Sequence, residues 1–336
     1  MTQGTTMKKL MIYGAAGYTG GMVAQHAASA GIDLLVAGRA QDRPALDALA
    51  GRLGAETRVF SLDDADAIEQ GLAGVAVLLN AAGPFAHTAG PLMAAAIKTG
   101  VHYLDFSAEL GTYREALALD AQAIAAGVML LPGSGGSVAM LGSLAGHAVA
   151  RVRQARKVSI ALSVAGAMSR GSVISASQNI APETLYLDAG ELLARSPDEV
   201  RGFDFGDGLQ SSFPVTLPDL LTIHNATGVP AIETYVHIGA GAFPAGDLER
   251  HPAGPSAEER AANRYRAAVE VTAADGKVAR SVLDTVNGYT FTAMAAAEAA
   301  RRVLAGEARP GFQTPAGLFG HGFAETIADT RIVDLD

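Results

Sequence analysis

KKLMIYGAAGYTGGMVAQHAASAGIDLLVAGR, residues 8–39, is the stretch of sequence that decides the fold of this chain. An apolar run typical of a buried parallel strand leads into a glycine turn, a helical segment and a second apolar run. The turn places Gly14, Gly17 and Gly20 at three-residue intervals, which permits a tight turn, close approach to a pyrophosphate and close helix packing. In such a site the helix directs its N-terminal N–H groups at the phosphates. We therefore expect a dinucleotide-binding turn, and a glycine-rich turn that holds no ligand is the alternative.

The residue at the end of the second strand predicts which dinucleotide binds. NAD sites carry an acidic residue there, about 20 residues after the glycines, to hold the ribose 2′-hydroxyl. This chain has Arg39 directly after Gly38, and the nearest acid, Asp33, lies at the other end of the strand. Because a guanidinium matches the geometry of a phosphate, we predict NADP(H), with Arg39 on the 2′-phosphate and Arg43 as a second contact. The alternative is an exposed arginine without a ligand.

Strands and helices alternate from the first strand to about residue 131, which predicts an α/β fold with a doubly wound parallel sheet. The segment NAAGPF, residues 80–85, ends the fourth strand with small side chains. In this fold the loop after that strand passes the second half of the cofactor, where bulky side chains would block the nicotinamide. We expect Ala82, Gly83, Pro84 and Phe85 to line the cofactor, unless the segment is an ordinary turn stiffened by its proline.

Polar side chains gather at the end of the predicted fifth strand, in VHYLDFSAE at 101–109. Ligands of an open α/β sheet bind outside the carboxyl ends of its strands, and a reductase needs a proton donor there. The candidate catalytic residues are therefore those that could meet at this edge, together with one cation from the second half of the chain: His87, Tyr103, Asp105, Glu109 and Arg170. For each of them, a satisfied core residue or a helix cap is the alternative.

The pattern changes after the glycine-rich segment PGSGGS, which predicts a domain boundary near residue 135. Strand-like segments at 157–166, 232–241 and 265–283 predict a second α+β domain on a mainly antiparallel sheet, with a mostly helical stretch at 176–194 between them. An alanine-rich helix at 290–307 is expected to pack back onto the first domain. We therefore assign 1–135 and 286–336 to a Rossmann domain and 136–285 to a substrate and dimerisation domain. The second sheet has edges and a face to bury, which favours a homodimer.

Composition excludes several classes of function. A net charge of −9 and a pI near 5.4 argue against a nucleic-acid partner, which clustered Lys and Arg would bind. The chain has no cysteine, so disulfides, thiolate metal sites and cysteine nucleophiles are excluded, and we expect no metal. The N-terminal sequence lacks a signal-peptide pattern, and no apolar run is long enough to cross a bilayer. We expect a cytoplasmic protein without membrane insertion.

Several motifs together resemble the saccharopine dehydrogenase-like family, including its trans-acting enoyl reductase branch. They are GAAGYTG, AGR, NAAGPF, GVHYLDFSAE, MSRGSVISA, GYTFTA and GFQTPAGLFG. The resemblance implies an NADP-binding Rossmann domain, a second domain inserted before the chain returns to the first, and hydride transfer to or from a small molecule. With the residues adjoining these motifs, the expected cofactor-binding set is Gly14, Ala16, Gly17, Tyr18, Thr19, Gly20, Gly38, Arg39, Ala82, Gly83, Pro84 and Phe85.

The chain departs from many members of that family in one segment. Relatives follow the sixth strand with a Pro-Gly segment and an aspartate-containing FDSVP-like motif, where this chain has SGGSVAM at 134–140. Two hypotheses follow. The first is an NADP(H)-dependent oxidoreductase that acts on a C=C, C=N or C=O of a small metabolite or acyl chain. The second is a non-catalytic NADP(H)-binding sensor or scaffold that keeps the cofactor site and lacks the chemistry.

Overall fold

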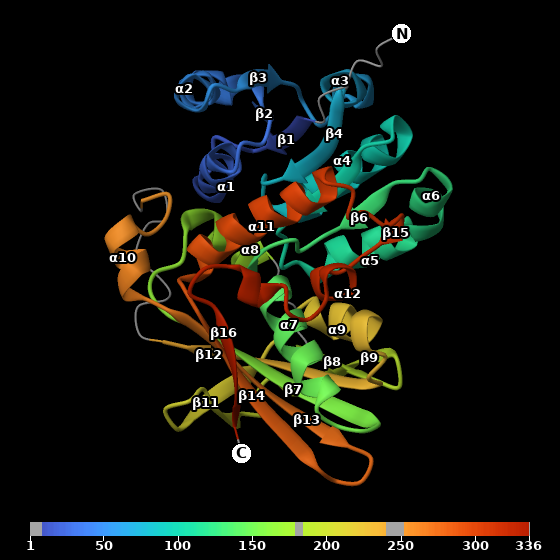
Figure 1. Cartoon of the computed structure of the whole chain (residues 1–336), viewed down its shortest axis with the longest axis vertical. Helices are drawn as coiled ribbons and strands as arrows, with labels where there is room; N and C mark the ends of the chain where they lie inside the picture. The colour runs from blue at the N-terminus through green and yellow to red at the C-terminus, as the bar shows by residue number, and fades with distance from the viewer. Residues whose placement is uncertain (1–8, 179–183, 240–251, 336) are drawn as a thin grey trace.

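The computed structural model of the protein describes residues 9–178, 184–239 and 252–335, and it contains two sheets joined by long helices (Figure 1). The first sheet has seven strands in the spatial order β15-β6-β5-β4-β1-β2-β3, and every neighbouring pair is parallel. Its strands are β1 (Lys9–Tyr13), β2 (Leu34–Gly38), β3 (Glu56–Val59), β4 (Val75–Asn80), β5 (His102–Asp105), β6 (Met129–Leu131) and β15 (Gly311–Phe312). The predicted doubly wound parallel sheet is confirmed.

Helices cover both faces of this sheet because each strand presents apolar side chains alternately to the two sides. Leu10 and Ile12 of β1 face one core cluster, whereas Met11 and Tyr13 face the other. The first face is covered by α1 (Tyr18–Ser29), α2 (Arg43–Leu53) and α11 (Gly288–Leu304). The second face is covered by α3 (Ala65–Gly71), α4 (Phe85–Thr99), α5 (Leu110–Ala118) and α6 (Asp120–Ala125). The strand order reverses between β1 and β4, and ligands of such folds bind in the crevice at that point.

The second sheet is mixed. Its main path runs in the spatial order β10-β11-β12-β7-β13-β14-β16, and the hairpin of β8 and β9 is attached to β12. Its strands are β7 (Ala155–Val164), β8 (Thr184–Asp188), β9 (Glu191–Arg195), β10 (Arg201–Asp204), β11 (Leu209–Pro214), β12 (Ala231–Ile238), β13 (Tyr265–Ala273), β14 (Val278–Thr285) and β16 (Arg331–Leu335). The strand-like segment predicted at 265–283 forms the antiparallel hairpin of β13 and β14. All pairs are antiparallel except β7 and β12, which are parallel over eight residue pairs.

The expectation of a mostly helical stretch at 176–194 is wrong. Helix α8 (Arg170–Gln178) ends near its start, and 184–195 forms the antiparallel hairpin of β8 and β9. Ala189 and Gly190 both have positive φ at the turn between these strands. That conformation suits a two-residue hairpin turn, and β8 gains a partner by pairing with β12. Tertiary pairing thus overrides the helical preference of the Leu and Ala residues here.

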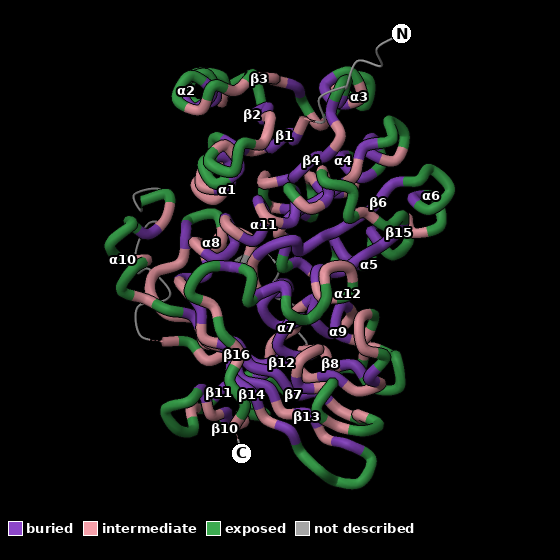
Figure 2. Tube along the Cα trace, in the orientation of Figure 1, coloured by how far each residue is buried: buried purple, intermediate pink, exposed green. Residues whose placement is uncertain are grey.

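Two helices, α7 (Gly136–Ala150) and α9 (Asp219–Thr227), cover the inner face of the second sheet. One apolar cluster runs from β1 through α7 and α11 to β7 and β13, so the two sheets share a continuous core. Figure 2 shows buried residues concentrated along α7 and through the middle of both sheets. The expected return of the chain is confirmed, because α11 packs on α1 and β15 joins the first sheet beside β6.

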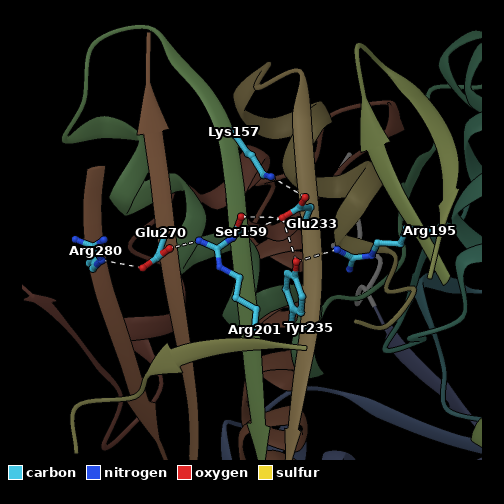
Figure 3. Close-up of polar contacts among 8 residues, drawn as sticks. All are labelled: Lys157, Ser159, Arg195, Arg201, Glu233, Tyr235, Glu270 and Arg280. Carbon is cyan, nitrogen blue, oxygen red and sulfur yellow. Dashed lines mark hydrogen bonds and ion pairs between the residues drawn. The ribbon is translucent and has the colours of Figure 1, made fainter. Parts of the chain in front are cut away.

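The outer face of the second sheet carries charged side chains beside a small buried apolar cluster that includes Phe203, Phe205 and Tyr235 (Figure 3). Glu233 pairs with Lys157 at 2.7 Å, and Glu270 lies between Arg201 and Arg280. Arg195 donates to the hydroxyl of Tyr235 at 3.0 Å. These contacts link strands that are far apart in sequence.

The structure also contains two shorter helices, α10 (Ala257–Ala262) and α12 (Pro315–Phe319). Ser256 and Glu259 form a capping box at the start of α10. The domain boundaries at 135 and 286 stay a prediction, and β16, which lies within 286–336, pairs with β14 of the second sheet. None of the described helices is both long and apolar enough to cross a membrane.

Candidate functional site

The glycine turn between β1 and α1 brings backbone groups close together at the sheet's carboxyl edge. Gly14 has φ +87°, and a Cβ there would lie 2.7 Å from the backbone nitrogen of Ala82. At Gly20 a Cβ would overlap the carbonyl oxygen of Gly14. Gly17 is the N-cap residue of α1, and the first turn of this helix contains no acidic residue. The turn therefore leaves the positive end of the helix open to an anion, as binding of a pyrophosphate requires.

The residues predicted to bind the cofactor around this turn differ in their exposure. Ala16 and Gly17 are exposed, Tyr18 and Thr19 are half-exposed in the first turn of α1, and Gly20 is buried against the strand. The exposure of Gly17 and the burial of Gly20 agree with the roles expected of these glycines. Gly17 permits close approach of a ligand, and Gly20 permits close packing of the helix on the strand.

Arg39 follows β2 at the same edge of the sheet. Its side chain is 63% exposed, and its Nε donates to Asp42 at 3.1 Å. Gly38 is buried, and a Cβ there would come within 3.3 Å of Leu46. Asp42 is a carboxylate that the sequence reading did not weigh, because it lies beyond the strand and is brought back by a turn of 3₁₀ helix at 40–42. The pair is exposed, so it restrains the guanidinium only weakly and leaves it available to a phosphate.

The loop after β4 is held in place by a buried amide. Asn80 is fully buried, and its side-chain oxygen accepts from the backbone nitrogen of Ala82 at 3.0 Å. Its amide nitrogen donates to the hydroxyls of Thr88 and Tyr103, at 3.0 and 3.2 Å. Thr88 in turn donates to the carbonyl of Ala82 at 2.6 Å. Asn80 therefore fixes the backbone beside Gly83, and the sequence reading noted it only as the end of the strand.

Glu109 caps the helix that follows this loop. Its two carboxylate oxygens accept from the backbone nitrogens of Phe85 and Ala86, at 3.0 and 2.7 Å. These are donors at the start of α4, which have no partner within the helix. The helix consequently begins at Phe85 and contains Pro91.

Tyr103 and Asp105 form a buried pair behind the loop. The Tyr103 hydroxyl donates to Asp105 Oδ2 at 2.8 Å, and both residues have no exposed surface. Asp105 Oδ1 accepts from the backbone nitrogens of Ser107 and Gly133, at 2.9 and 2.8 Å. Burial raises the pKa of Asp105 to about 6, against the opposing effect of these hydrogen bonds. Burial also raises the pKa of Tyr103 well above its usual value.

The other two catalytic candidates lie at the surface. His87 is exposed in the first turn of α4, and Arg170 is the first residue of α8 in the second domain. Helix α8 approaches the cofactor loop, since a Cβ at Gly83 would lie 3.6 Å from the Ser175 hydroxyl. The structure thus brings Tyr103, Asp105 and Glu109 together around the loop 82–85, with His87 at its outer side.

One buried carboxyl was missed by the sequence reading. Asp219 opens α9 and has no exposed surface, and neither of its carboxylate oxygens has a hydrogen-bond partner in the part of the chain that the structure describes. Burial raises its pKa to about 7. An aspartate that follows a proline is typical of the start of a helix. No signal in the sequence could therefore have shown that the side chain of Asp219 is buried. Among the described residues, no three His, Asp or Glu side chains are grouped as metal ligands.

Comparison with known proteins agrees with this geometry. Residues 10–131 match the family model described as the saccharopine dehydrogenase NADP-binding domain. Comparison with curated proteins finds no match. Among solved structures, the chain is similar to apo saccharopine dehydrogenase (L-Glu forming) from Saccharomyces cerevisiae, with 13% identity, a TM-score of 0.67, and coverage of 98% of this chain and 100% of that chain. It is also similar to a probable dehydrogenase from Thermotoga maritima, with 12% identity, a TM-score of 0.49, and coverage of 97% and 98%.

The similarity to the yeast structure, at 13% identity, shows a shared fold alone. The family match is more specific, because it covers the glycine turn, Arg39, the loop 80–85 and the Tyr103–Asp105 pair. The expected resemblance to the saccharopine dehydrogenase-like family is confirmed. Residues 10–131 are therefore similar to the saccharopine dehydrogenase NADP-binding domain, and the chain that carries them is an NAD(P)-dependent oxidoreductase.

Proposed function

We propose that this protein is an NADP(H)-dependent oxidoreductase that transfers a hydride to or from a C=C, C=N or C=O of a small metabolite or acyl chain. The observation that carries the proposal is the open, acid-free N-terminus of α1 beside Arg39, at the point where the strand order reverses. When bound, NADPH supplies the hydride from its nicotinamide ring. The trans-acting enoyl reductase branch stays a prediction that rests on motifs alone.

In this proposal, the residues of the chain divide the work along the sheet edge. The glycine turn binds the pyrophosphate, Arg39 binds the 2′-phosphate, and the loop 82–85 lies along the nicotinamide half. Asn80 and Glu109 hold that loop through three hydrogen bonds to its backbone and to the start of α4. The loop then orients the nicotinamide ring toward α8, and its small residues keep bulky side chains away from the face of the ring.

We assign the five catalytic candidates to two roles. His87 lies at the surface beside the loop, and Arg170 lies at the surface at the start of α8. We assign both to the substrate, His87 as proton donor and Arg170 as the partner of an anionic group. Tyr103, Asp105 and Glu109 act through the loop, because their side chains are buried and already hydrogen-bonded. Substrate enters between α4 and α8.

The test is oxidation of NADPH by the purified chain across a panel of enoyl, imine and keto substrates. Turnover of any one class by the wild-type chain, with a loss of at least tenfold in kcat in His87→Ala, supports the proposal. Turnover that is the same in the wild type and in His87→Ala would show that His87 is not the donor. The expected loss follows from the usual contribution of a general acid, about 10²–10⁴-fold.

A non-catalytic NADP(H)-binding sensor or scaffold is the second candidate function. One observation favours it: Tyr103, Asp105 and Glu109 are fully engaged in hydrogen bonds within the protein. NADPH binding without turnover of any substrate class in the same panel would favour the sensor. The panel thus separates the two candidates on one preparation of protein.

We further propose a homodimer that buries the outer face of the second sheet. The supporting observation is the set of opposite charges on that face: Lys157, Glu233 and Glu270 stand on the adjacent strands β7, β12 and β13, and Arg201 of β10 pairs with both glutamates (Figure 3). Light scattering of the wild-type chain and of Arg201→Glu tests it, because the dimer is expected to weaken in the variant. We also propose a cytoplasmic location, supported by the absence of cysteine and testable by cell fractionation.

A further inference from the structure

The second domain contacts the phosphate-binding turn through one tyrosine side chain. Tyr18 is the first residue of α1, and its hydroxyl donates to the carbonyl of Pro255 and accepts from Nη1 of Arg260 at 2.6 Å. The chain packs directly on the ring, since a Cβ at Gly254 would lie 2.5 Å from it. Figure 1 shows α10, which carries Arg260, on the same side of the molecule as α1. An element of the second domain therefore reaches the start of the cofactor helix.

Arg260 is held in this position from two sides. Its Nη1 also donates to the carbonyl of Pro255 at 2.8 Å, and its Cζ lies 5.8 Å from the centre of the Tyr18 ring. The turn before it is fixed by the capping box of Ser256 and Glu259. The two hydrogen bonds use a single nitrogen of the guanidinium, which has five N–H donors.

The charge of Arg260 matters because the turn itself supplies no cation. The segment GAAGYTGGMVAQ at 14–25 contains neither Lys nor Arg, and the whole chain has a net charge of −9. A dinucleotide pyrophosphate brings two negative charges, against roughly half a positive charge from the helix dipole. The nearby Arg264, which follows α10, is by contrast paired with the carboxylate of Asp284. Within residues 9–178, 184–239 and 252–335, the guanidinium of Arg260 forms no ion pair with a carboxylate.

We propose that Arg260, contributed by the second domain, binds the pyrophosphate of the dinucleotide held at the N-terminus of α1. The inference rests on the proposed NADP(H) function and extends its cofactor site across the domain boundary. It makes a prediction that separates Arg260 from Arg39. The pyrophosphate is common to NADPH and NADH, so Arg260 contributes equally to the affinity for both, whereas Arg39 contributes only to NADPH.

The experiment measures the dissociation constants of NADPH and NADH for the full chain by fluorescence titration, without substrate. The variants are Arg260→Met, which keeps an apolar stem without the charge, and Arg260→Lys, which keeps the charge. Arg264→Met is the matched control, since it removes a neighbouring arginine that is already paired with Asp284. We expect Arg260→Met to raise both dissociation constants by the same factor, about fivefold to tenfold. The increase in Arg260→Lys is expected to be smaller, and Arg264→Met is expected to leave both constants unchanged.

Other results for the dissociation constants would contradict either the role of Arg260 or the proposed function. Equal dissociation constants in the wild type and in Arg260→Met would overturn the inference and leave the proposed function intact. A weakening of NADPH alone would also overturn it, because that would place Arg260 on the 2′-phosphate. If the wild-type chain binds neither dinucleotide, the proposed function itself fails. Should Arg260→Met not fold, Arg260→Lys decides alone: an increase of the same factor in both dissociation constants supports the contact, and wild-type constants or unequal changes contradict it.

Discussion

Glu109 holds the backbone N–H of Phe85 with one carboxylate oxygen at 3.0 Å, while its other oxygen accepts from the next residue. Twenty-four residues of sequence separate the two partners, and the bond joins the end of one strand to the start of the helix after another. A single side chain therefore couples the segment after β5 to the loop that faces the nicotinamide in the proposed site.

Glu109→Gln is expected to destabilise the protein, because an amide offers one acceptor oxygen in place of two and carries no charge. The loss of one charge-assisted bond at a buried site costs about 1–3 kcal/mol in the free energy of unfolding. Urea denaturation of the variant measures it. Asp66→Asn, an exposed change in the first turn of α3, is the control and is expected to change stability by less than about 0.5 kcal/mol. Equal stability of Glu109→Gln and wild type would show that the cap is dispensable.

Gly14→Ala is expected to disrupt the phosphate-binding turn. The residue has φ +87°, and the new Cβ would lie 2.7 Å from the nitrogen of Ala82, so both the backbone and the loop must shift. We expect a loss of stability of about 1–3 kcal/mol or more and no measurable binding of NADPH. In Gly21→Ala, one turn into the same helix, the Cβ would make an ordinary contact, so stability should stay or rise by about 0.5–1 kcal/mol. Thermal unfolding and NADPH titration of both variants check this contrast.

Arg39→Ala is expected to change the preference between the two cofactors. Loss of a charge-assisted contact to the 2′-phosphate should raise the dissociation constant of NADPH about tenfold or more and leave that of NADH unaltered. Arg52→Ala removes an arginine from the last turn of α2 and serves as control. An unchanged ratio of the two affinities in Arg39→Ala would contradict the assignment of NADP(H).

Asp219 predicts a stability that falls as the pH rises. Burial raises the pKa of its carboxyl to about 7 in the folded protein, above the value of about 4 in an unfolded chain. The contribution of Asp219 to the free energy of unfolding is therefore fully present below about pH 4. It is lost progressively as the pH rises through about 7, by up to about 1.4 kcal/mol per pH unit. Asp219→Asn, which cannot ionise, should flatten this dependence between pH 4.5 and 7.5.

The measurement is the free energy of unfolding from urea titrations at several values of pH across that range. Asp47→Asn, an exposed change in α2, is the control and should reproduce the slope of the wild type. If the free energy of unfolding depends on pH equally in Asp219→Asn and in the wild type, the carboxyl of Asp219 does not titrate in this range.

Local sequence was sufficient for the first domain because its signals are local. The buried run of β1, the glycine spacing and the arginine after β2 lie within 32 consecutive residues, and they predicted the strand, turn, helix and strand that the structure contains. Elsewhere, local preference failed. Leu and Ala between 184 and 195 suggested a helix, and pairing of β8 with β12 made a hairpin instead.

By itself, then, the sequence determined the succession of strands and helices along the first sheet, the glycine turn between β1 and α1, and the place of Arg39 after β2, since periodicity and glycine spacing act over a few residues. Only the tertiary structure decided what Tyr103, Asp105, Glu109 and Asp219 do, because burial and hydrogen-bond partners come from strands and helices far away in the chain. It also decided that Tyr18 meets Arg260 across 242 residues, a contact that no local pattern records.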